Sequence, residues 1–239
     1  MTIGLNRAGG PILELTDVVK RYGAGTTEVR ALTNVSLTVE PGELVALMGP
    51  SGSGKSTLLH LAGGLERPTA GRVVVAGRDL DAEDASGLAA LRRRTVGLVF
   101  QRLNLVPTLT AMENVMLPLE MDGIAPKKAR VEATGALRMV AVDGPLDRYP
   151  DDLSGGQQQR VAIARAIVAD PSLLICDEPT GDLDRESAGE VLALLQALNR
   201  EHGKTIVMVT HDPKAAEAAA RIVHLDKGSL AAEPTGAAA

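Results

Sequence analysis

The sequence predicts an α/β protein whose sheet is mainly parallel, and three observations lead to that prediction. From residue 44 to residue 209, short apolar runs alternate with segments of helical periodicity, which is typical of a parallel sheet covered by helices. A glycine-rich loop joins the first of these runs to the helix that follows it. Polar and charged side chains stand directly after several of the runs. The carboxyl ends of parallel strands share one edge of a sheet, so we expect these side chains to meet there.

Antiparallel strands are expected on the N-terminal side of the glycine-rich loop. Residues 12–20 alternate apolar and polar side chains, as a half-buried strand does, and a glycine-rich turn follows Tyr22. Residues 29–39 are predicted to form a further pair of strands, ended by the Pro-Gly turn at 41–42. Three consecutive valines at 73–75 are expected to extend the same sheet.

The glycine-rich loop has the sequence GPSGSGKST, which fits the phosphate-binding pattern G-x-x-x-x-G-K-[ST]. Glycines let backbone N–H groups turn inward around an anion, and the N-terminus of the following helix adds a positive charge. Lys55 is expected to reach the β- and γ-phosphates of a nucleotide, and Ser56 to place its hydroxyl on Mg²⁺. The alternative is a glycine-rich turn that contains a lysine by chance. The residues predicted to bind phosphates are Gly49, Pro50, Ser51, Gly52, Ser53, Gly54, Lys55, Ser56 and Thr57.

The middle of the chain differs in character from both ends. A buried strand is expected at residues 96–100, with Gln101 at its end. Residues 102–152 then carry five prolines and helix-like pieces with little β-branched alternation. Thr110 is expected to cap one helix, and Pro126 to begin another, since proline is favoured in the first turn. We interpret this region as a helical insert between two halves that form the sheet.

The last third returns to alternating helices and strands. We expect a helix at residues 154–169, a buried strand at 173–176, and an amphipathic helix at 185–202. A strand at 205–209 and short final strands between 221 and 230 complete the predicted sheet.

Two adjacent carboxylates, Asp177 and Glu178, stand at the end of one buried strand. Buried adjacent acids are costly unless they have partners or a chemical task. Asp177 can complete the coordination of Mg²⁺, and Glu178 can orient or deprotonate an attacking water. The alternative is a strand that leaves the core through two solvated acids.

The stretch LSGGQQQR supplies a second predicted phosphate-facing helix end. Ser154, Gly155, Gly156 and Gln157 offer N–H groups and a hydroxyl at a helix start. A γ-phosphate held between two such ends, one from each of two chains, requires copies that pair head to tail. The alternative is an N-capped helix with flexible glycines.

These motifs together resemble the ATPase subunit of an ATP-binding cassette (ABC) transporter. The resemblance covers residues 12–230 and includes LLICDEPTGDLD as well as the two glycine-rich motifs. The hairpin at 22–29 and the stretches HLAGGLERPTAG and FQRLNLVPTLTAMENVMLPL are similar to the lipoprotein-release and macrolide-export subgroup. The resemblance implies a RecA-like phosphate-loop NTPase core with a mainly parallel sheet, an antiparallel β subdomain and a helical subdomain. Its expected division is a core and β subdomain at 12–101 and 164–230, a helical subdomain at 102–163, and a disordered tail at 231–239.

The resemblance also implies roles for individual residues. Tyr22 would stack on adenine, the alternative being a tyrosine at the rim of the site. The LSGGQ helix start would contact ATP held by the opposite subunit, and Asp184 would communicate across that dimer. The residues expected to act in catalysis are Glu178, His211 and Gln101, and those expected to ligate Mg²⁺ are Ser56, Gln101 and Asp177.

Bulk composition limits the setting in which this chemistry is expected. The 239 residues carry a formal net charge of −5, which argues against nucleic acid as a partner. The single cysteine, Cys176, excludes an intrachain disulfide and fits a reducing cytoplasm. The sequence shows no signal peptide and no apolar run long enough to cross a membrane.

We therefore expect a cytoplasmic Mg-ATPase, peripheral on the inner face of the membrane. It would form an ATP-dependent homodimer and dock on a separate integral membrane permease through residues 102–119. One alternative is the ATPase of a membrane complex that transports nothing, such as one that controls cell division. Another is a soluble ABC protein of DNA repair or translation, but the long inserts or second cassette that such proteins require are absent.

Overall fold

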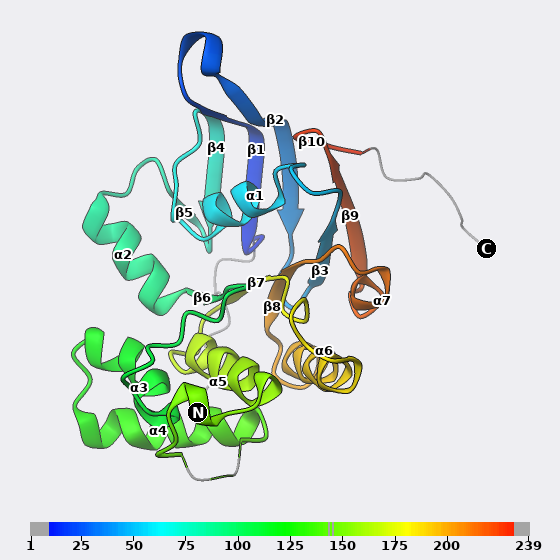
Figure 1. Ribbon diagram of the computed structural model, residues 1–239. Coiled ribbons are helices and arrows are strands. Elements are labelled where there is room, and N and C mark those ends of the chain that lie inside the picture. The colour runs from blue at the N-terminus through cyan, green and yellow to red at the C-terminus, as the bar shows by residue number, and fades with distance from the viewer. Residues whose placement is uncertain (1–9, 143, 145, 232–239) are drawn as a thin grey trace.

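The computed structural model describes residues 10–142, 144 and 146–231 (Figure 1). The strands are β1 Leu13–Tyr22, β2 Val29–Val39, β3 Leu44–Met48, β4 Ala70–Val75, β5 Arg78–Asp79, β6 Val96–Val99, β7 Leu173–Asp177, β8 Thr205–Val209, β9 Arg221–Asp226 and β10 Ser229–Leu230. The helices are α1 Lys55–Ala62, α2 Ala85–Arg94, α3 Ala111–Met121, α4 Pro126–Met139, α5 Gly155–Ile167, α6 Arg185–Arg200 and α7 Pro213–Ala216, with 3₁₀ turns at η1 Gly25–Thr27 and η2 Pro150–Asp152. Residues 232–239 of the predicted tail lie outside the described residues.

The strands form two sheets, as the fold class requires. The larger sheet has the order β10-β9-β3-β8-β7-β6, and its pairs are parallel except for the short antiparallel β10. The smaller sheet, β2-β1-β4-β5, is antiparallel. The prediction of a mainly parallel sheet accompanied by an antiparallel β subdomain is confirmed.

The prediction of two strands within residues 29–39 is wrong, because this segment is the single strand β2. It pairs with β1 from Leu13↔Val39 to Tyr22↔Val29. Asn34 has a positive φ of 49°, and the register of the pair shifts near it. Asn34 therefore forms an irregularity that bends β2 without ending it.

Both faces of the parallel sheet are buried, by alternate residues of each strand. On β3, Leu44 and Ala46 face the core shared with the helices, whereas Val45 and Leu47 face the core shared with the antiparallel sheet and α1. Strands β7 and β8 alternate in the same way. The molecule is therefore layered, with α3, α4, α5 and α6 on one side of the parallel sheet and the antiparallel sheet on the other (Figure 1).

Helices α3, α4 and α5 pack against one another in the lower part of Figure 1. Thr110 caps α3 in a reciprocal capping box with Glu113, as expected for the cap. The helix continues past Pro118 to Met121, where Val115, Met116 and Leu119 are buried against the neighbouring helices. The one-turn helix α7, capped by Asp212, was not expected.

The segment between β6 and α3 is fixed by one buried side chain. Asn114 is completely buried, accepts a hydrogen bond from the Val106 N–H at 2.7 Å, and donates to the carbonyl oxygens of Val106, Leu109 and Thr110 at 3.0–3.1 Å. A single amide therefore contacts four backbone groups of this loop, with one of its two N–H hydrogens shared between two carbonyl oxygens.

Among the described residues, no helix is both long and apolar enough to span a membrane.

We predict that Asn114→Ala lowers the free energy of unfolding by about 2–3 kcal/mol, because the buried Val106 N–H loses its acceptor. Chemical denaturation followed by circular dichroism measures the change. Thr134→Ala is the control: it removes one exposed hydrogen bond within α4, to the Arg130 carbonyl, and should change stability by less than about 0.5 kcal/mol. Equal small losses in the two variants would contradict the role assigned to Asn114.

Candidate functional site

A cavity of about 660 Å³ lies at the carboxyl edge of the parallel sheet, where the phosphate loop meets residues from three other strand ends. Gln101 follows β6, Asp177 and Glu178 end β7, and His211 follows β8. The expectation that these side chains meet at one edge is thus met by the geometry. The lining residues are Val29, Arg30, Ala31, Gly49, Pro50, Ser51, Gly52, Gly54, Lys55, Ser56, Thr57, Gln101, Asp177, Glu178, Val209 and His211.

The phosphate loop is packed too closely for side chains at two of its glycines. A Cβ on Gly49 would lie 2.0 Å from the Leu225 carbonyl oxygen, and one on Gly54 would lie 2.4 Å from that of Ala31. Both glycines have positive φ, of 156° and 103°. The loop is therefore a tight backbone turn leading into the N-terminus of α1, which is the form of a phosphate cradle.

Two polar groups of the loop are held at this cradle. The Lys55 ammonium donates to the carbonyl oxygens of Gly49 and Pro50, at 2.8 and 2.9 Å. Ser53 is buried, and its Oγ has no hydrogen-bond partner among the described residues. A cation fixed inside the loop and an unpaired hydroxyl beside it both suit a bound polyphosphate.

Ser56 and Asp177 combine a hydroxyl with a carboxylate at the mouth of the loop. Burial raises the pKa of the Asp177 carboxyl above its ordinary value, and the charge of Glu178 adds to this. A hydrogen bond with the Ser56 side chain opposes the rise. Hydroxyl and carboxylate oxygens are ligands that Mg²⁺ prefers, so this pair fits that ion.

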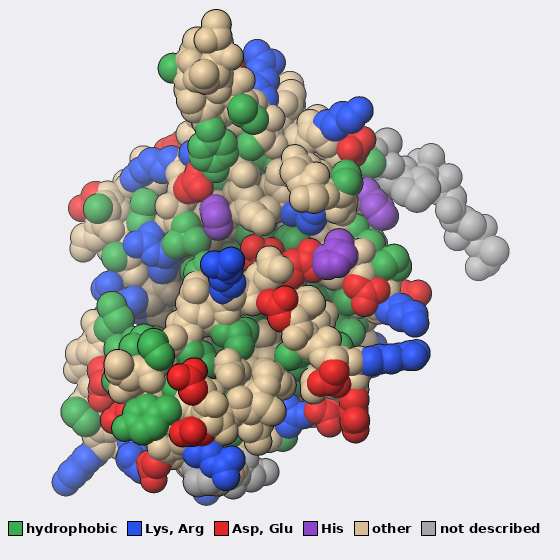
Figure 2. All heavy atoms as spheres, viewed as in Figure 1, with side chains coloured by type: hydrophobic (Ala, Val, Ile, Leu, Met, Phe, Trp, Pro, Cys, Tyr) green, Lys and Arg blue, Asp and Glu red, His purple; other side chains and the backbone are tan. Residues whose placement is uncertain are grey.

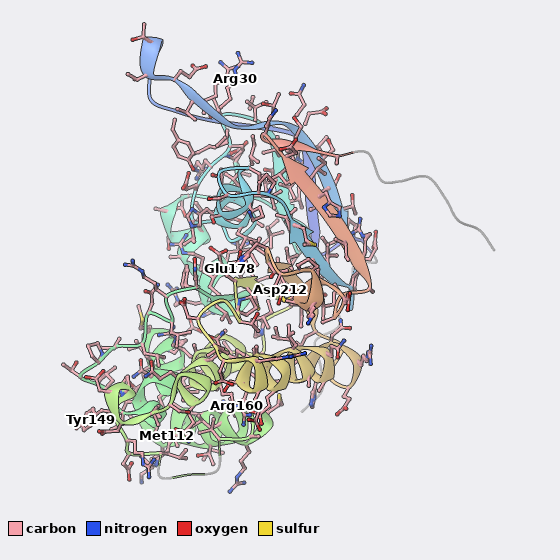
Figure 3. The ribbon with its side chains drawn as sticks, turned by 45° about the vertical axis from the view of Figure 1, so that its right-hand side comes forward. Arg30, Met112, Tyr149, Arg160, Glu178 and Asp212 are labelled. Carbon is pink, nitrogen blue, oxygen red and sulfur yellow. The ribbon has the colours of Figure 1, made fainter. Side chains whose placement is uncertain are left out.

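Glu178 is held in a constrained geometry beside His211. Its φ is +48°, an unusual value for a residue with a side chain, and its N–H donates to the Val209 carbonyl at 3.0 Å. Glu178 Oε1 lies 2.9 Å from His211 Nδ1. The carboxylate side chain is 12% exposed and the imidazole 70%. Figure 3 shows Glu178 near the centre of the molecule, close to Asp212 from the next strand end. Backbone strain retained at a mostly buried carboxylate is typical of a functional site.

The second predicted helix end forms as expected but stands apart from the phosphate loop of the same chain. Ser154 caps α5, accepting from the Gln157 N–H, while the Gln157 side chain accepts from the Ser154 N–H. Ser154, Gly156 and Gln157 do not line the cavity of the phosphate loop. Gly155 lines a second cavity, of about 250 Å³, which shares Gln101 and Glu178 with the first.

Asp184 has a local structural role that the sequence analysis missed. It caps α6, accepting from the Glu186 and Ser187 N–H groups at 3.0 Å and from the Ser187 hydroxyl at 2.7 Å. These hydrogen bonds, led by the one from the Ser187 backbone, hold the pKa of Asp184 below its usual range. A Cβ on Gly156 would lie 3.0 Å from Ser187 Oγ, so the starts of α5 and α6 pack closely.

Tyr22 lies at the end of β1, beside the cavity and outside its lining residues. Its cross-strand partner, Val29, does line the cavity. The Tyr22 hydroxyl donates to Glu66 Oε2 at 2.7 Å. Burial raises the pKa of Tyr22, and the hydrogen bond to Glu66 raises it further. No role is predicted for Glu66 from the sequence, because nothing local in the sequence places it beside Tyr22.

Arg165 is another residue that the sequence analysis missed. Its guanidinium donates to the carbonyl oxygens of Leu103 and Asn104, both at 2.6 Å, and burial lowers its pKa. It therefore ties α5 to the loop that follows Gln101. One signal was available, since Arg165 follows Val161 by four positions on the buried side of the predicted helix, where a charge requires a partner.

Charged side chains and histidines gather across the middle of the face shown in Figure 2, between the β-rich and the helical parts.

Comparison with known families gives a match to the ABC transporter family model over residues 32–181.

Relatives from the lipoprotein-releasing and macrolide-export systems align with more than nine tenths of the chain. A lipoprotein-releasing system ATP-binding protein, LolD, of Anaeromyxobacter dehalogenans is 51% identical over 93% of this chain and 94% of its own length. A macrolide export ATP-binding/permease protein, MacB, of Hyphomonas neptunium is 48% identical over 92% of this chain. This chain spans only 34% of that MacB relative and 31% of the MacB of Syntrophobacter fumaroxidans. The predicted resemblance to the lipoprotein-release and macrolide-export subgroup is confirmed.

Solved structures agree with the fold. The ATP-binding cassette MJ0796, in a dimeric post-hydrolysis state bound to ADP and Pi, has a TM-score of 0.84 and 42% identity. The match covers 91% of this chain and 96% of that one. The predicted fold class is confirmed.

We predict that the thiol of Cys176 is unreactive in the native protein. It is completely buried on β7 next to Asp177, and burial raises its pKa, which removes the reactive thiolate. Labelling with a chromogenic disulfide reagent should be at least about 10³-fold slower without denaturant than with it, because attack then requires opening of the sheet. Equal rates would show that the strand carrying Asp177 is not buried as described.

Proposed function

The chain belongs to the ABC transporter family, and from that membership we propose that it is a Mg-dependent ATPase that powers a transporter. The observation that carries the proposal is the convergence of the phosphate loop, Asp177, Glu178, His211 and Gln101 on one cavity. The match to a cassette solved with ADP and Pi supports ATP as the ligand.

Each group in or beside the cavity has a task in this proposal. The backbone of residues 49–57 and the Lys55 ammonium bind the phosphates of ATP, and Tyr22 stacks on its adenine. Ser56, Asp177 and Gln101 hold Mg²⁺. When bound, the ion neutralises charge on the phosphate oxygens.

Hydrolysis is assigned to Glu178 with His211 and Gln101. The Glu178 carboxylate orients a water and accepts its proton, and His211 contacts the γ-phosphate. The 2.9 Å contact between Glu178 and His211 supports a joint role, since each side chain limits the orientation of the other. Gln101 contacts both the ion and the water.

A second copy of the chain completes each site. Ser154, Gly155, Gly156 and Gln157 of one copy contact the ATP held by the phosphate loop of the other. The separation of this helix end from the cavity within one chain supports the pairing, as does the dimeric state of MJ0796. Asp184 lies at the start of α6 beside α5 and couples the two ATP sites across the dimer.

The membrane part of the transporter lies on a separate chain in this proposal. The MacB relatives are named as ATP-binding/permease proteins, of which this chain spans about a third. The LolD relatives are named as ATP-binding proteins and match over nearly their full length. We place the permease contact at residues 102–119, within a helical subdomain at 102–163, and the protein on the cytoplasmic face of the membrane. An ATPase of a non-transporting membrane complex would use the same site.

We predict that Glu178→Gln binds ATP, loses at least about 100-fold in hydrolysis, and accumulates as a dimer. The amide keeps the shape of the side chain but cannot accept the water's proton, so the closed state persists. Size-exclusion chromatography with ATP measures the dimer, and Glu120→Gln, an exposed acid on α3, is the matched control. A Glu178→Gln protein that binds ATP yet stays monomeric would overturn the shared-site proposal.

A mixing experiment tests whether the two halves of a site come from different chains. Lys55→Ala removes the phosphate-loop cation, and Ser154→Asp keeps a capping oxygen while adding a charge that repels the γ-phosphate. We predict that each variant alone is inactive and that an equal mixture recovers about a quarter of wild-type activity, since random pairing leaves one intact site in half of the dimers. A mixture no more active than its components would show that both halves belong to one chain.

A further inference from the structure

A cluster of four side chains lies beside the nucleotide cavity, and Glu66 is at its centre. Glu66 follows α1, and its Oε2 accepts from the Tyr22 hydroxyl at 2.7 Å and lies 2.9 Å from Lys20 Nζ. Its Oε1 lies 3.2 Å from His60 Nδ1. Both carboxylate oxygens are therefore engaged, one of them by two donors.

Glu66 is itself held in place and remains charged. Its N–H donates to the His60 carbonyl at 3.3 Å, which fixes the turn that ends α1. Burial raises the pKa of the carboxyl, but the hydrogen bonds from Tyr22, Lys20 and His60 outweigh that effect and leave the pKa below its ordinary value. At neutral pH Glu66 is therefore an ionised group that only accepts hydrogen bonds.

The side chains of Glu66, Lys20 and Thr57 all interact with Tyr22. Its hydroxyl is fixed by Glu66, and the Lys20 ammonium lies 5.0 Å from the ring centroid, as in a cation–π contact. Lys20 is anchored in turn by the Arg67 carbonyl at 2.8 Å. Tyr22 is 39% exposed, so the protein covers it only in part. Because the ring is covered only in part, the polar contact at its hydroxyl contributes to its orientation.

The same carboxylate connects the ring to the phosphate loop. His60 belongs to α1, the helix that starts with Lys55 and Ser56. Glu66 thus ties the end of β1 in the antiparallel sheet to the helix whose N-terminus faces the phosphates. A nucleotide must contact both parts at once, so their spacing determines how well base and phosphates fit together.

We propose that Glu66 is a positioning residue for base recognition: by accepting the Tyr22 hydroxyl, it holds the ring at a fixed distance and angle from the phosphate loop, ready to stack on the nucleobase. This inference rests on the stacking role given to Tyr22 in the proposed function. Glu66 touches neither the nucleotide nor the reacting atoms. It acts by ordering the ring before the ligand arrives, which reduces the ordering cost of binding.

The test compares a ligand that has a base with one that lacks it. Binding of Mg-ADP and of Mg-pyrophosphate to the full chain is measured by titration calorimetry for the wild type and for Glu66→Ala, Glu66→Gln, Tyr22→Phe and Tyr22→Ala. We expect Glu66→Ala and Tyr22→Phe each to weaken ADP binding by roughly 3- to 10-fold and to leave pyrophosphate binding unchanged. Glu66→Gln keeps an oxygen that can accept a hydrogen bond from the Tyr22 hydroxyl, so it should retain most of the ADP affinity that Glu66→Ala loses.

Steady-state kinetics and a double variant supply independent readouts. Glu66→Ala should raise KM for ATP by a similar factor with kcat unchanged, because the hydrolytic groups are untouched. Tyr22→Phe combined with Glu66→Ala should be no worse than either single variant, since both remove the same hydrogen bond. Glu83→Ala is the matched control: Glu83 is 22% exposed against 28% for Glu66, and it pairs with Arg78 away from Tyr22.

Three results would overturn the inference. An equal loss of ADP and pyrophosphate affinity in Glu66→Ala would show a general structural role. Additive losses in the double variant would show that Glu66 acts through another group. Unchanged ADP affinity in Glu66→Ala, with a loss in Tyr22→Ala, would remove Glu66 and keep the role of Tyr22. Unchanged ADP affinity in Tyr22→Ala would instead reject the stacking role assigned under the proposed function.

Discussion

The register of the parallel sheet is the constraint on which the candidate site depends. Leu47 of β3 pairs with Val209 of β8, and Val209 pairs with Asp177 of β7. Three strands therefore end at one level, and the residues after them are placed side by side before any side chain makes contact. Both faces of these strands are buried, so a slip of one residue would exchange the two cores, and the register is strongly fixed.

Hydrogen bonds hold the loops that follow the strand ends in place relative to the sheet. The segment after Gln101 is held at one end by Arg165 from α5 and at the other by Asn114 from α3. Both anchors belong to helices, α5 and α3, and they hold the residues that follow Gln101. The Glu178 N–H bonded to the Val209 carbonyl performs the same function at the end of β7.

The parts of the site that could be predicted from sequence are those encoded locally. The phosphate loop needs its glycines and lysine within nine residues, and Asp177 and Glu178 directly follow their buried strand, so both were found. The cap of α5 by Ser154 was found for the same reason. Glu66 was not found, since its partners Lys20 and Tyr22 are more than forty residues away and only the folded turn after α1 brings them together.

Two other predictions from the sequence differ from the structure because contacts formed only in the fold decide the outcome. Residues 29–39 were predicted as two strands, whereas pairing with β1 along its length keeps this segment a single strand with an irregularity near Asn34. Asp184 was assigned only a role between subunits, although its carboxylate is occupied by the start of α6. A capping carboxylate at a helix end that faces solvent can serve both purposes, but its local role is decided by the fold.

In the proposed function, one chain cannot complete its own reaction site, because its two phosphate-facing helix ends serve different nucleotides. The most direct measurement is the ATPase rate per molecule at saturating ATP over a wide range of protein concentration. We expect this rate to fall toward zero on dilution and to rise to a plateau as copies pair. A rate per molecule that stays constant down to concentrations at which only monomers are present would contradict it.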